Sequence, residues 1–356
     1  MNIALFHTTL PEPHRKVGGV EAVVHRLATA LAEIPDHTVT VLSLTPPPPG
    51  APYQHIHLFA EQPWLADSPA ARWFLLPALL NQVDLSPYDI VHLHGDDWFW
   101  IRRGIPSVRT MHGSALDEAR TATSWKRRLV QHAIYPLEHL SARLATACWG
   151  ISPTCAARYR ADRCMPNGVD LERFRPGPKT DTPSLLFVGT WEGRKRGGWL
   201  FDQFCAKVLP RVPAATLVMV ADRVSEACAA HPNVKVLHYP NDATLADWYQ
   251  RAWVFAYPSV YEGFGLPYLE AMASGTPIVA TPNPGARYVL DDGRYGILAD
   301  DSDFADALVT LLHRPERRTA LAEQGLQRAD AFSWIAIAQQ HAEAYAALVA
   351  PTKVLA

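Results

Sequence analysis

Short apolar runs rich in β-branched residues alternate with helix-period patterns along the whole chain. In the first half, such runs predict five strands, at residues 2–7, 37–44, 54–60, 89–94 and 106–111. Most of these runs are apolar at successive positions, which is typical of strands that are covered on both faces. The segment 20–33 between the first two runs predicts a helix whose apolar stripe consists of Val20, Val23, Val24, Leu27 and Leu31. The pattern therefore predicts a parallel sheet between layers of helices.

The segment 166–183, PNGVDLERFRPGPKTDTP, is rich in Pro, Gly and charge and is interpreted as an interdomain linker. After it the alternation restarts, with strands expected at 185–189, 216–221, 234–239, 253–257, 277–281 and 295–299 and helices at about 199–209, 242–252, 265–274 and 302–313. Two such series predict an α/β protein of two Rossmann-like, doubly wound domains that face each other across a cleft. The domains are expected over 1–172 and 173–333, and a C-terminal helix at about 334–350 is expected to pack back onto the first.

The composition is that of a folded, globular chain. Of the 356 residues, 48% are hydrophobic and 19% are charged, and the net charge is −2, so no global field favours nucleic acid. The five cysteines are odd in number and form no CxxC pair, which fits a reducing compartment better than a disulfide framework or a zinc site. The N-terminus lacks the pattern of a signal peptide, and no apolar run is long enough to span a bilayer. A cytoplasmic location is expected, with peripheral contact at the inner face of the membrane left open.

Two loops combine glycine with a setting that suits an anion. Gly18 and Gly19 stand directly before the first helix, where exposed backbone N–H groups and the helix dipole favour negative charge. A flexible turn is the simpler interpretation of this pair. Gly189 ends a strand and is followed by Arg194 and Lys195, which brings a basic cluster to the carboxyl edge of the predicted sheet. Cations at a helix start oppose the helix dipole, which favours an anionic partner over a merely solvated surface.

A third loop, 258–281, is denser in such features. Glu262 lies in the loop, and Glu270 lies about one turn inside the helix that follows. Between them the backbone of Gly263, Phe264, Gly265 and Leu266 leads into the helix, whose first turn holds Pro267. A phosphate bound there would have a carboxylate on each side, able to accept hydrogen bonds from sugar hydroxyls. The alternative is a glycine-rich turn with two surface glutamates.

The stretch YEGFGLPYLEAMASG resembles the signature of family 4 retaining glycosyltransferases, which have the GT-B fold. The resemblance covers nearly the whole chain, in the family's order. Its other motifs are Gly18-Gly19-Val20-Glu21, Thr110-Met111-His112-Gly113, Pro166-Asn167-Gly168-Val169-Asp170 and the loop from Gly189 to Lys195. The resemblance implies a hexosyltransferase that moves a sugar from a UDP- or GDP-linked donor to a glycan, lipid-linked or small-molecule acceptor. Biosynthesis of cell-surface polysaccharide or glycoconjugate is the implied setting.

The resemblance also implies roles for individual residues. Glu270 is similar to the glutamate that holds the donor ribose, and Glu262 to the one that contacts hydroxyls of the transferred sugar. His112 is similar to the histidine that reaches the donor sugar. Arg194 and Lys195 resemble the basic pair that neutralises the diphosphate. The implied catalytic set is therefore His112, Glu262, Arg194 and Lys195.

The implied donor-binding set adds backbone and loop positions to these side chains. It consists of Gly18, Gly19, Gly189, Thr190, Arg194, Lys195, Glu262, Gly263, Phe264, Gly265, Leu266 and Glu270. Thr190 departs from the family, because many members carry Arg directly after the glycine that matches Gly189. Fixed cations and helix N-termini would stabilise the leaving diphosphate without a metal ion, so neither metal nor cofactor is expected.

Two other patterns suggest a metal ion, and each has a simpler interpretation. His92, His94, Asp96, Asp97 and His112 could gather around a metal, but cleft lining or packing accounts for them as well. The triplet Asp301-Ser302-Asp303 matches a DxD pattern, but it precedes a helix at 304–313, where capping is the simpler account.

The predicted helix 124–145 contains Pro136, where a kink is expected, and begins with Trp125, Lys126, Arg127 and Arg128. Its basic start and apolar residues suit contact with a membrane that carries a lipid-linked acceptor, although a buried amphipathic helix with a solvated basic end is favoured. Three alternative functions remain: a non-hydrolysing nucleotide-sugar 2-epimerase of the same fold, a non-catalytic nucleotide-sugar-binding module and a dinucleotide-dependent oxidoreductase. The last lacks a GxGxxG after the first strand.

Overall fold

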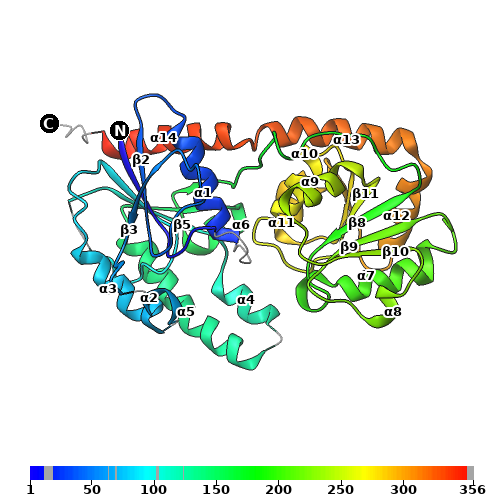
Figure 1. The fold of residues 1–356 in the computed structure, drawn as a ribbon, viewed down its shortest axis with the longest axis horizontal. Helices are drawn as coiled ribbons and strands as arrows, with labels where there is room; N and C mark the ends of the chain where they lie inside the picture. Colours follow the sequence, from blue (N-terminus) through cyan, green and yellow to red (C-terminus); the bar gives the residue numbers. More distant parts are fainter. Residues whose placement is uncertain (12–18, 63, 69, 102–103, 123, 351–356) are drawn as a thin grey trace. The chain divides into compact units, whose positions relative to one another are not determined.

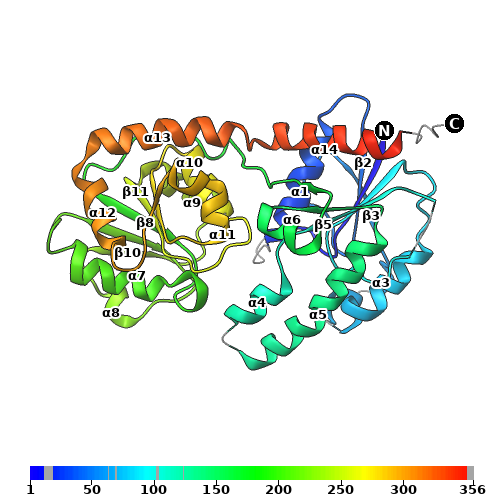
Figure 2. The same cartoon turned by 180° about the vertical axis from the view of Figure 1, so that it is seen from behind.

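The computed structural model describes residues 1–11, 19–62, 64–68, 70–101, 104–122 and 124–350. The chain divides into two compact units, each built around one parallel sheet (Figures 1 and 2). The first unit comprises Met1–Arg120, Ser124–Gly168 and the C-terminal segment from Trp334, and the second comprises Val169–Ser333. The first unit thus ends at Gly168 rather than at residue 172. Gly168 lies against the ring of Trp334, where a Cβ atom would come within 2.5 Å of the indole.

The sheet of the first unit has seven parallel strands in the order β3-β2-β1-β4-β5-β6-β7. The strands are β1 (Asn2–Phe6), β2 (Thr38–Ser43), β3 (Gln54–His57), β4 (Ile90–Leu93), β5 (Ser107–Met111), β6 (Ala147–Gly150) and β7 (Arg163–Cys164). All but the two edge strands are buried almost throughout, as their continuous apolar runs predict. The sequence pattern did not predict β6 and β7.

Helices cover this sheet on both faces. They are α1 (Gly19–Ala32), α2 (Trp64–Asp67), α3 (Leu76–Leu79), α4 (Ala115–Thr121), α5 (Trp125–Leu144), α6 (Pro153–Tyr159) and α14 (Trp334–Val349). The C-terminal helix α14 packs beside α1, and residues of both helices join β1, β2 and Trp149 of β6 in one core cluster. The helix α1 buries the face that carries its apolar stripe, because Val24, Leu27 and Leu31 recur at helical spacing and are fully buried.

The sheet of the second unit has six parallel strands in the order β10-β9-β8-β11-β12-β13. The strands are β8 (Ser184–Val188), β9 (Thr216–Val220), β10 (Val234–Leu237), β11 (Val254–Tyr257), β12 (Ile278–Ala280) and β13 (Ile297–Leu298). The helices are α7 (Gly197–Gln203), α8 (Glu226–Ala229), α9 (Asp242–Arg251), α10 (Leu266–Ala273), α11 (Pro284–Val289), α12 (Phe304–His313) and α13 (Pro315–Asp330). Both sheets thus have the doubly wound order that was predicted, with a switch point between β1 and β4 in the first unit and between β8 and β11 in the second.

The boundary between the two units lies within the predicted linker 166–183, whereas the expectation that helix 124–145 is buried was wrong. Much of the segment 166–183 is folded onto the second unit: Val169 and Phe174 are buried, and the N–H of Val169 donates to the carbonyl of Phe332. The helix α5 is largely exposed rather than buried, and Ser141 is its only buried residue. It is assigned as one helix through Pro136. No helix among the described residues has the length and apolarity needed to cross a bilayer.

Candidate active site

The loop after β8 carries the basic residues. The strand ends at Val188, Gly189 follows, and a short 3-10 turn spans Gly193–Lys195. A Cβ atom at Gly189 would lie 3.0 Å from Cβ of Lys195, so only glycine lets the lysine fold back against the strand end. Arg196 ends the turn in the left-handed conformation, with a φ of 58°. The loop therefore returns Lys195 to the carboxyl edge of the sheet.

The loop after β11 carries the acidic residue. β8 and β11 are hydrogen-bonded neighbours in a parallel sheet, so their carboxyl ends meet at the switch point. Glu262 lies in this loop, and the helix α10 begins after Gly265, whose φ is 96°. A Cβ atom on Gly265 would also collide with the ring of Tyr268 at 2.4 Å. The glycine is thus required both by conformation and by space.

These loops bring three charged side chains into direct contact. Nζ of Lys195 lies 2.5 Å from Oε1 of Glu262, and Nη1 of Arg194 lies 3.1 Å from Oε2. Ser259 donates its hydroxyl to Oε1 at 2.5 Å, and Lys195 also donates to the hydroxyl of Tyr257. Glu262 is 5% exposed. We call Arg194, Lys195, Tyr257, Ser259 and Glu262 the charged cluster.

In the charged cluster, two cations, Arg194 and Lys195, pair with one buried anion, Glu262. Burial by itself would raise the pKa of Glu262, but the charges of Lys195 and Arg194 outweigh it and lower that pKa, so the carboxylate is ionised. Burial lowers the pKa of Lys195, an effect that Glu262 partly offsets. Two of the three ammonium N–H groups of Lys195 go to Tyr257 and Glu262, and among the described residues none takes the third. The charged cluster therefore has one positive charge in excess of its negative charge, and its side chains are fixed by their mutual hydrogen bonds.

Glu270 lies on α10, half-buried, about one turn from its start. Burial raises the pKa of its carboxyl group, and the nearby hydroxyl of Tyr249 and the positive charges of Arg173 and Lys195 only partly oppose this rise. Its predicted role as the ribose ligand stays a prediction. The same holds for contact of Glu262 with sugar hydroxyls, since both of its carboxylate oxygens are occupied by the charged cluster.

The other predicted donor-binding positions of this unit lie in the same two loops. Thr190 donates its hydroxyl to the carbonyl of Glu192 at 2.8 Å and so stabilises the loop after β8. Phe264 is buried, whereas Gly263 and Leu266 are partly exposed at the entrance to α10. They lie at the start of α10, whose first turn is partly exposed at Leu266 and Pro267 and buried at Tyr268.

Several residues of this site were missed by sequence reasoning. Asn283 caps α11 by accepting from the N–H of Ala286, and its amide donates to the carbonyl of Ser259 and the hydroxyl of Tyr268. Gly285 donates to the carbonyl of Glu262, and a Cβ atom there would lie 2.5 Å from the Phe264 carbonyl. The dipeptide Asn283-Pro284 is a helix-start signal that could have pointed to this support.

In the first unit, His112 directly follows β5 and Gly19 begins α1. Nε2 of His112 lies 2.9 Å from Nδ1 of His94, which follows β4. Gly19 is exposed, and a Cβ atom there would meet no atom within 4 Å. Gly18 lies outside the described residues.

The residues that suggested a metal ion have other partners. Asp97 is buried and pairs with Arg109 at 3.2 Å, and it accepts from Ser141 at 2.6 Å. Asp301 receives two hydrogen bonds from Arg196, each of 2.7 Å. Asp303 stands at the N-cap position of α12, but its side chain makes no capping bond, so the capping interpretation was wrong in that detail. No group of three or more His, Cys, Asp or Glu residues in the described part of the chain is arranged to hold a metal ion.

Comparison with known families agrees with this architecture. The family described as Glycosyltransferase Family 4 matches residues 17–173, and Glycosyl transferases group 1 matches residues 182–314. A D-inositol 3-phosphate glycosyltransferase of Corynebacterium urealyticum is 32% identical over 319 residues, covering 76% of this chain and 74% of the relative. The corresponding protein of Streptosporangium roseum is 28% identical, covering 78% of this chain and 74% of the relative.

Solved structures show the same fold. Sucrose-phosphate synthase from Thermosynechococcus elongatus superposes with a TM-score of 0.76 at 22% identity, over 98% of this chain and 99% of that one. Anabaena HepE, solved with UDP and glucose, superposes with a TM-score of 0.70 at 17% identity, over 98% and 100%. These likenesses agree with the two doubly wound sheets and with the charged loops at the switch point of the second unit. The chain is therefore a transferase enzyme with the GT-B fold and belongs to glycosyltransferase family 4.

Proposed function

We propose that this enzyme moves a hexose-type sugar from a UDP- or GDP-linked donor, with retention of anomeric configuration and without a metal ion. The charged cluster carries the proposal, because a departing nucleoside diphosphate needs fixed positive charge where its own charge develops. Arg194 and Lys195 are held in place by Glu262, so they need little reorganisation when the bond to the sugar breaks. Glu270 would bind the ribose, and His112 would contact the transferred sugar.

Retention requires no protein nucleophile in this proposal. The leaving phosphate oxygen takes the proton of the acceptor hydroxyl, while the new glycosidic bond forms on the face from which the diphosphate departs. Glu262 is the carboxylate nearest to this chemistry, but its two oxygens are bound to Lys195, Arg194 and Ser259. Glu262 therefore positions the two cations and does not act as a nucleophile at the anomeric carbon.

A thermal-shift screen with UDP, GDP and their sugar conjugates tests the donor class, since a ligand of the folded state raises its melting temperature. A shift with one nucleotide and its sugars, lost in Lys195→Ala and reduced in Glu270→Ala, is expected. An unchanged shift in both variants contradicts the site. Recovery of the donor with an altered configuration at C2 of its sugar indicates an epimerase instead.

Metal independence has its own test. Transfer or slow hydrolysis of the donor is expected to be the same with and without a chelator such as EDTA, because Arg194 and Lys195 supply the positive charge. Loss of the reaction on chelation, with recovery on adding Mg²⁺ or Mn²⁺, contradicts this part of the proposal.

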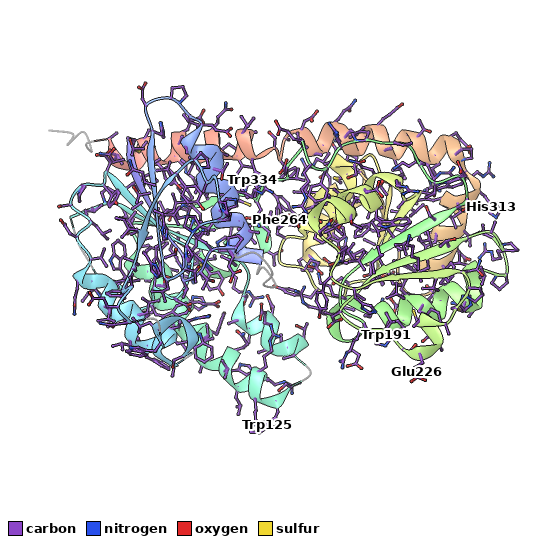
Figure 3. The ribbon with its side chains drawn as sticks, in the orientation of Figure 1. Trp125, Trp191, Glu226, Phe264, His313 and Trp334 are labelled. Carbon is purple, nitrogen blue, oxygen red and sulfur yellow. The ribbon has the colours of Figure 1, made fainter. Side chains whose placement is uncertain are left out.

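The acceptor is proposed to be a glycan, a small molecule or a lipid-linked sugar used in cell-surface polysaccharide or glycoconjugate biosynthesis. The exposed helix α5 favours the lipid-linked class. Trp125 is 67% exposed and Leu129 is 60% exposed, and Figure 3 shows Trp125 directed away from the ribbon of its own unit. Lys126 and Arg128 are exposed beside them. Aromatic and apolar side chains flanked by cations are typical of helices that lie in the membrane interface.

The one acidic residue of α5 faces inward. Glu138 accepts from the N–H of Ala115 at 3.1 Å and from the hydroxyl of Tyr159. The helix itself thus contributes no carboxylate to its outer face, although Glu118 of α4 pairs with Arg127 at 3.1 Å. Lys126 and Arg128 carry the positive charge, and a bilayer containing phosphatidylglycerol is the proposed partner. Each cation near such a surface contributes about 1 kcal/mol to binding.

Sedimentation with lipid vesicles tests this contact. We expect binding to vesicles of phosphatidylglycerol and phosphatidylcholine, but not to phosphatidylcholine alone. Trp125→Gln with Leu129→Gln, and Lys126→Gln with Arg128→Gln, should each weaken it. Lys207→Gln with Arg317→Gln removes two exposed cations of the second unit as the matched control. Equal binding by all of these proteins contradicts the role of α5.

A further inference from the structure

A stack of histidines fills the switch point of the first unit. His94 follows β4, and its ring lies 3.9 Å from the ring of His92, centre to centre. His92 is anchored on both nitrogens, by the hydroxyl of Thr110 at 2.7 Å and by the hydroxyl of Tyr345 at 2.5 Å. Tyr345 comes from the C-terminal helix α14. His92 therefore has a complete set of partners within the core.

His94 is different. Its Nδ1 lies 2.9 Å from Nε2 of His112, but its own Nε2 is out of contact with solvent and has no hydrogen-bond partner among the described residues. A buried polar atom without a partner costs about 1–3 kcal/mol. An apolar side chain at position 94 would avoid this cost. The polar contact that His94 does make is with His112, the residue proposed to touch the transferred sugar.

The unpaired Nε2 of His94 also determines the direction of the hydrogen bond between His94 and His112. Burial lowers the pKa of His94 and of His112 well below the usual value, so both imidazoles are neutral and each carries one N–H. If His94 carried its proton on Nε2, that N–H would be buried without an acceptor. With the proton on Nδ1 it is donated to His112, and only a lone pair is left unpaired. Orphaned buried N–H groups are the rarer case in native proteins.

We propose that His94 is a positioning residue that donates from Nδ1 to Nε2 of His112 and so holds His112 in the tautomer with its proton on Nδ1. His112 then presents an N–H donor, in a fixed ring orientation, to an oxygen of the transferred sugar. This inference rests on the proposed role of His112 in sugar transfer. It goes further by naming the residue that selects the donor form of the ring.

Two substitutions at position 94 separate positioning from packing. His94→Leu removes the donor and the unpaired nitrogen. We expect turnover to fall about 10–100-fold, by analogy with the loss of partners that orient metal-bound histidines. Its melting temperature should be equal to or above that of the wild type. His94→Asn places an amide nitrogen near the position of Nδ1 and should restore much of the turnover. Nucleotide affinity should not change in either variant.

Nitrogen-15 NMR of histidine-labelled enzyme reads the tautomer directly. The wild type and His94→Asn should show the His112 proton on Nδ1, and His94→Leu should show a mixture or the other tautomer. Tyr345→Phe, which removes a partner of His92 in the same stack, is the control: it should lower stability and leave turnover unchanged. A wild-type His112 proton on Nε2, or full turnover in His94→Leu, overturns the inference. If His112→Ala lowers turnover while His94→Leu does not, only this inference fails; full turnover in His112→Ala overturns the proposed role of His112 as well.

Discussion

Both units place buried polar residues at the switch point of a parallel sheet, but the two groups differ in electrical character. In the second unit, Lys195, Arg194 and Glu262 are charged and bound to one another. In the first unit, His94 and His112 are kept neutral by burial. The same topology thus supports a site for strong charge in one unit and a site of uncharged imidazoles in the other.

The difference matches what each site is proposed to bind. A diphosphate carries full negative charge, and fixed cations in a water-poor site stabilise it strongly. A sugar hydroxyl is neutral, and a buried imidazolium beside it would require a costly desolvation. Neutral histidines can donate or accept a hydrogen bond without that cost. Each cluster therefore suits one part of a nucleotide-sugar, and this contrast can be tested unit by unit.

The largest effect is expected from Lys195→Ala. Loss of one preorganised donor raises the activation free energy by about 3–4 kcal/mol, because the charge on the departing diphosphate is less stabilised. Turnover should therefore fall roughly 100- to 1000-fold. Steady-state kinetics with the donor from the thermal-shift screen measures this. The control is Lys179→Ala, because Lys179 is another lysine of the second unit whose ammonium group is bound to a side chain, the hydroxyl of Thr276. A comparable loss in the control assigns the effect to folding rather than to the charged cluster.

Lys195→Ala also leaves the buried carboxylate of Glu262 without one of its two cationic partners. Loss of one partner of a buried ion pair typically lowers the free energy of unfolding by about 3–5 kcal/mol. Lys195→Met combined with Glu262→Gln removes both charges. We expect this double variant to regain much of the stability but none of the turnover. Recovery of turnover would show that charge is not what the cluster contributes.

Mild acid should destabilise the first unit before the second. Burial lowers the pKa of His341 from 6.5 to about 4, so the unfolded chain takes up a proton as the pH falls through 6.5 while the folded unit does not. This residue alone removes about 3 kcal/mol between pH 6.5 and 4. Glu262, with its pKa below 4.5, keeps its contribution to the second unit down to lower pH.

Hydrogen exchange resolved by peptide, at about pH 7 and about pH 5, measures this difference. Protection of β4, β5 and α14 should fall more than protection of β8 and β11. His341→Leu should reduce the pH dependence of the first unit. Equal loss of protection in both units would contradict the contrast between neutral and charged clusters.

A smaller effect is expected from Glu270→Gln. The half-buried carboxylate would exchange a charge-assisted hydrogen bond to ribose for a neutral one, which costs about 1–2 kcal/mol, or roughly tenfold in nucleotide affinity. Titration calorimetry with UDP or GDP measures the change. Glu192→Gln is the control, since Glu192 is an exposed partner of Arg223. An unchanged affinity in Glu270→Gln removes the ribose assignment.

The smallest effect is expected from Asp301→Asn. Arg196 loses one of two hydrogen bonds, but Asp301 is half exposed and Arg196 still donates to the carbonyl of Pro258 and stacks on Trp199. Exposed ion pairs contribute about 0.2–1 kcal/mol, so chemical denaturation should show a loss in that range. Chelator and added Mg²⁺ should not change the result. A metal-dependent change in Asp301→Asn would revive the DxD interpretation.

The sequence alone determined the element types, the two-domain architecture and the two loops of the second unit. Periodicity and apolar character are local properties of a run, so a run such as 185–189 predicts its strand without knowledge of any partner. Glycine next to charge, as in Gly189 with Lys195, is also visible locally. Short strands and edge elements such as β6 and β7 were missed, because a few residues carry too little periodic signal.

Tertiary structure alone decided which of these residues touch. Glu262 is 67 residues from Lys195 and Tyr345 is 253 residues from His92, and nothing local marks either pair. Their contacts follow from the order of strands in each sheet and from the return of α14 to the first unit, which depend on how whole faces are buried. Packing across such distances also determines three features that no pattern along the chain encodes. They are the occupied oxygens of Glu262, the exposed face of α5 and the unpaired nitrogen of His94.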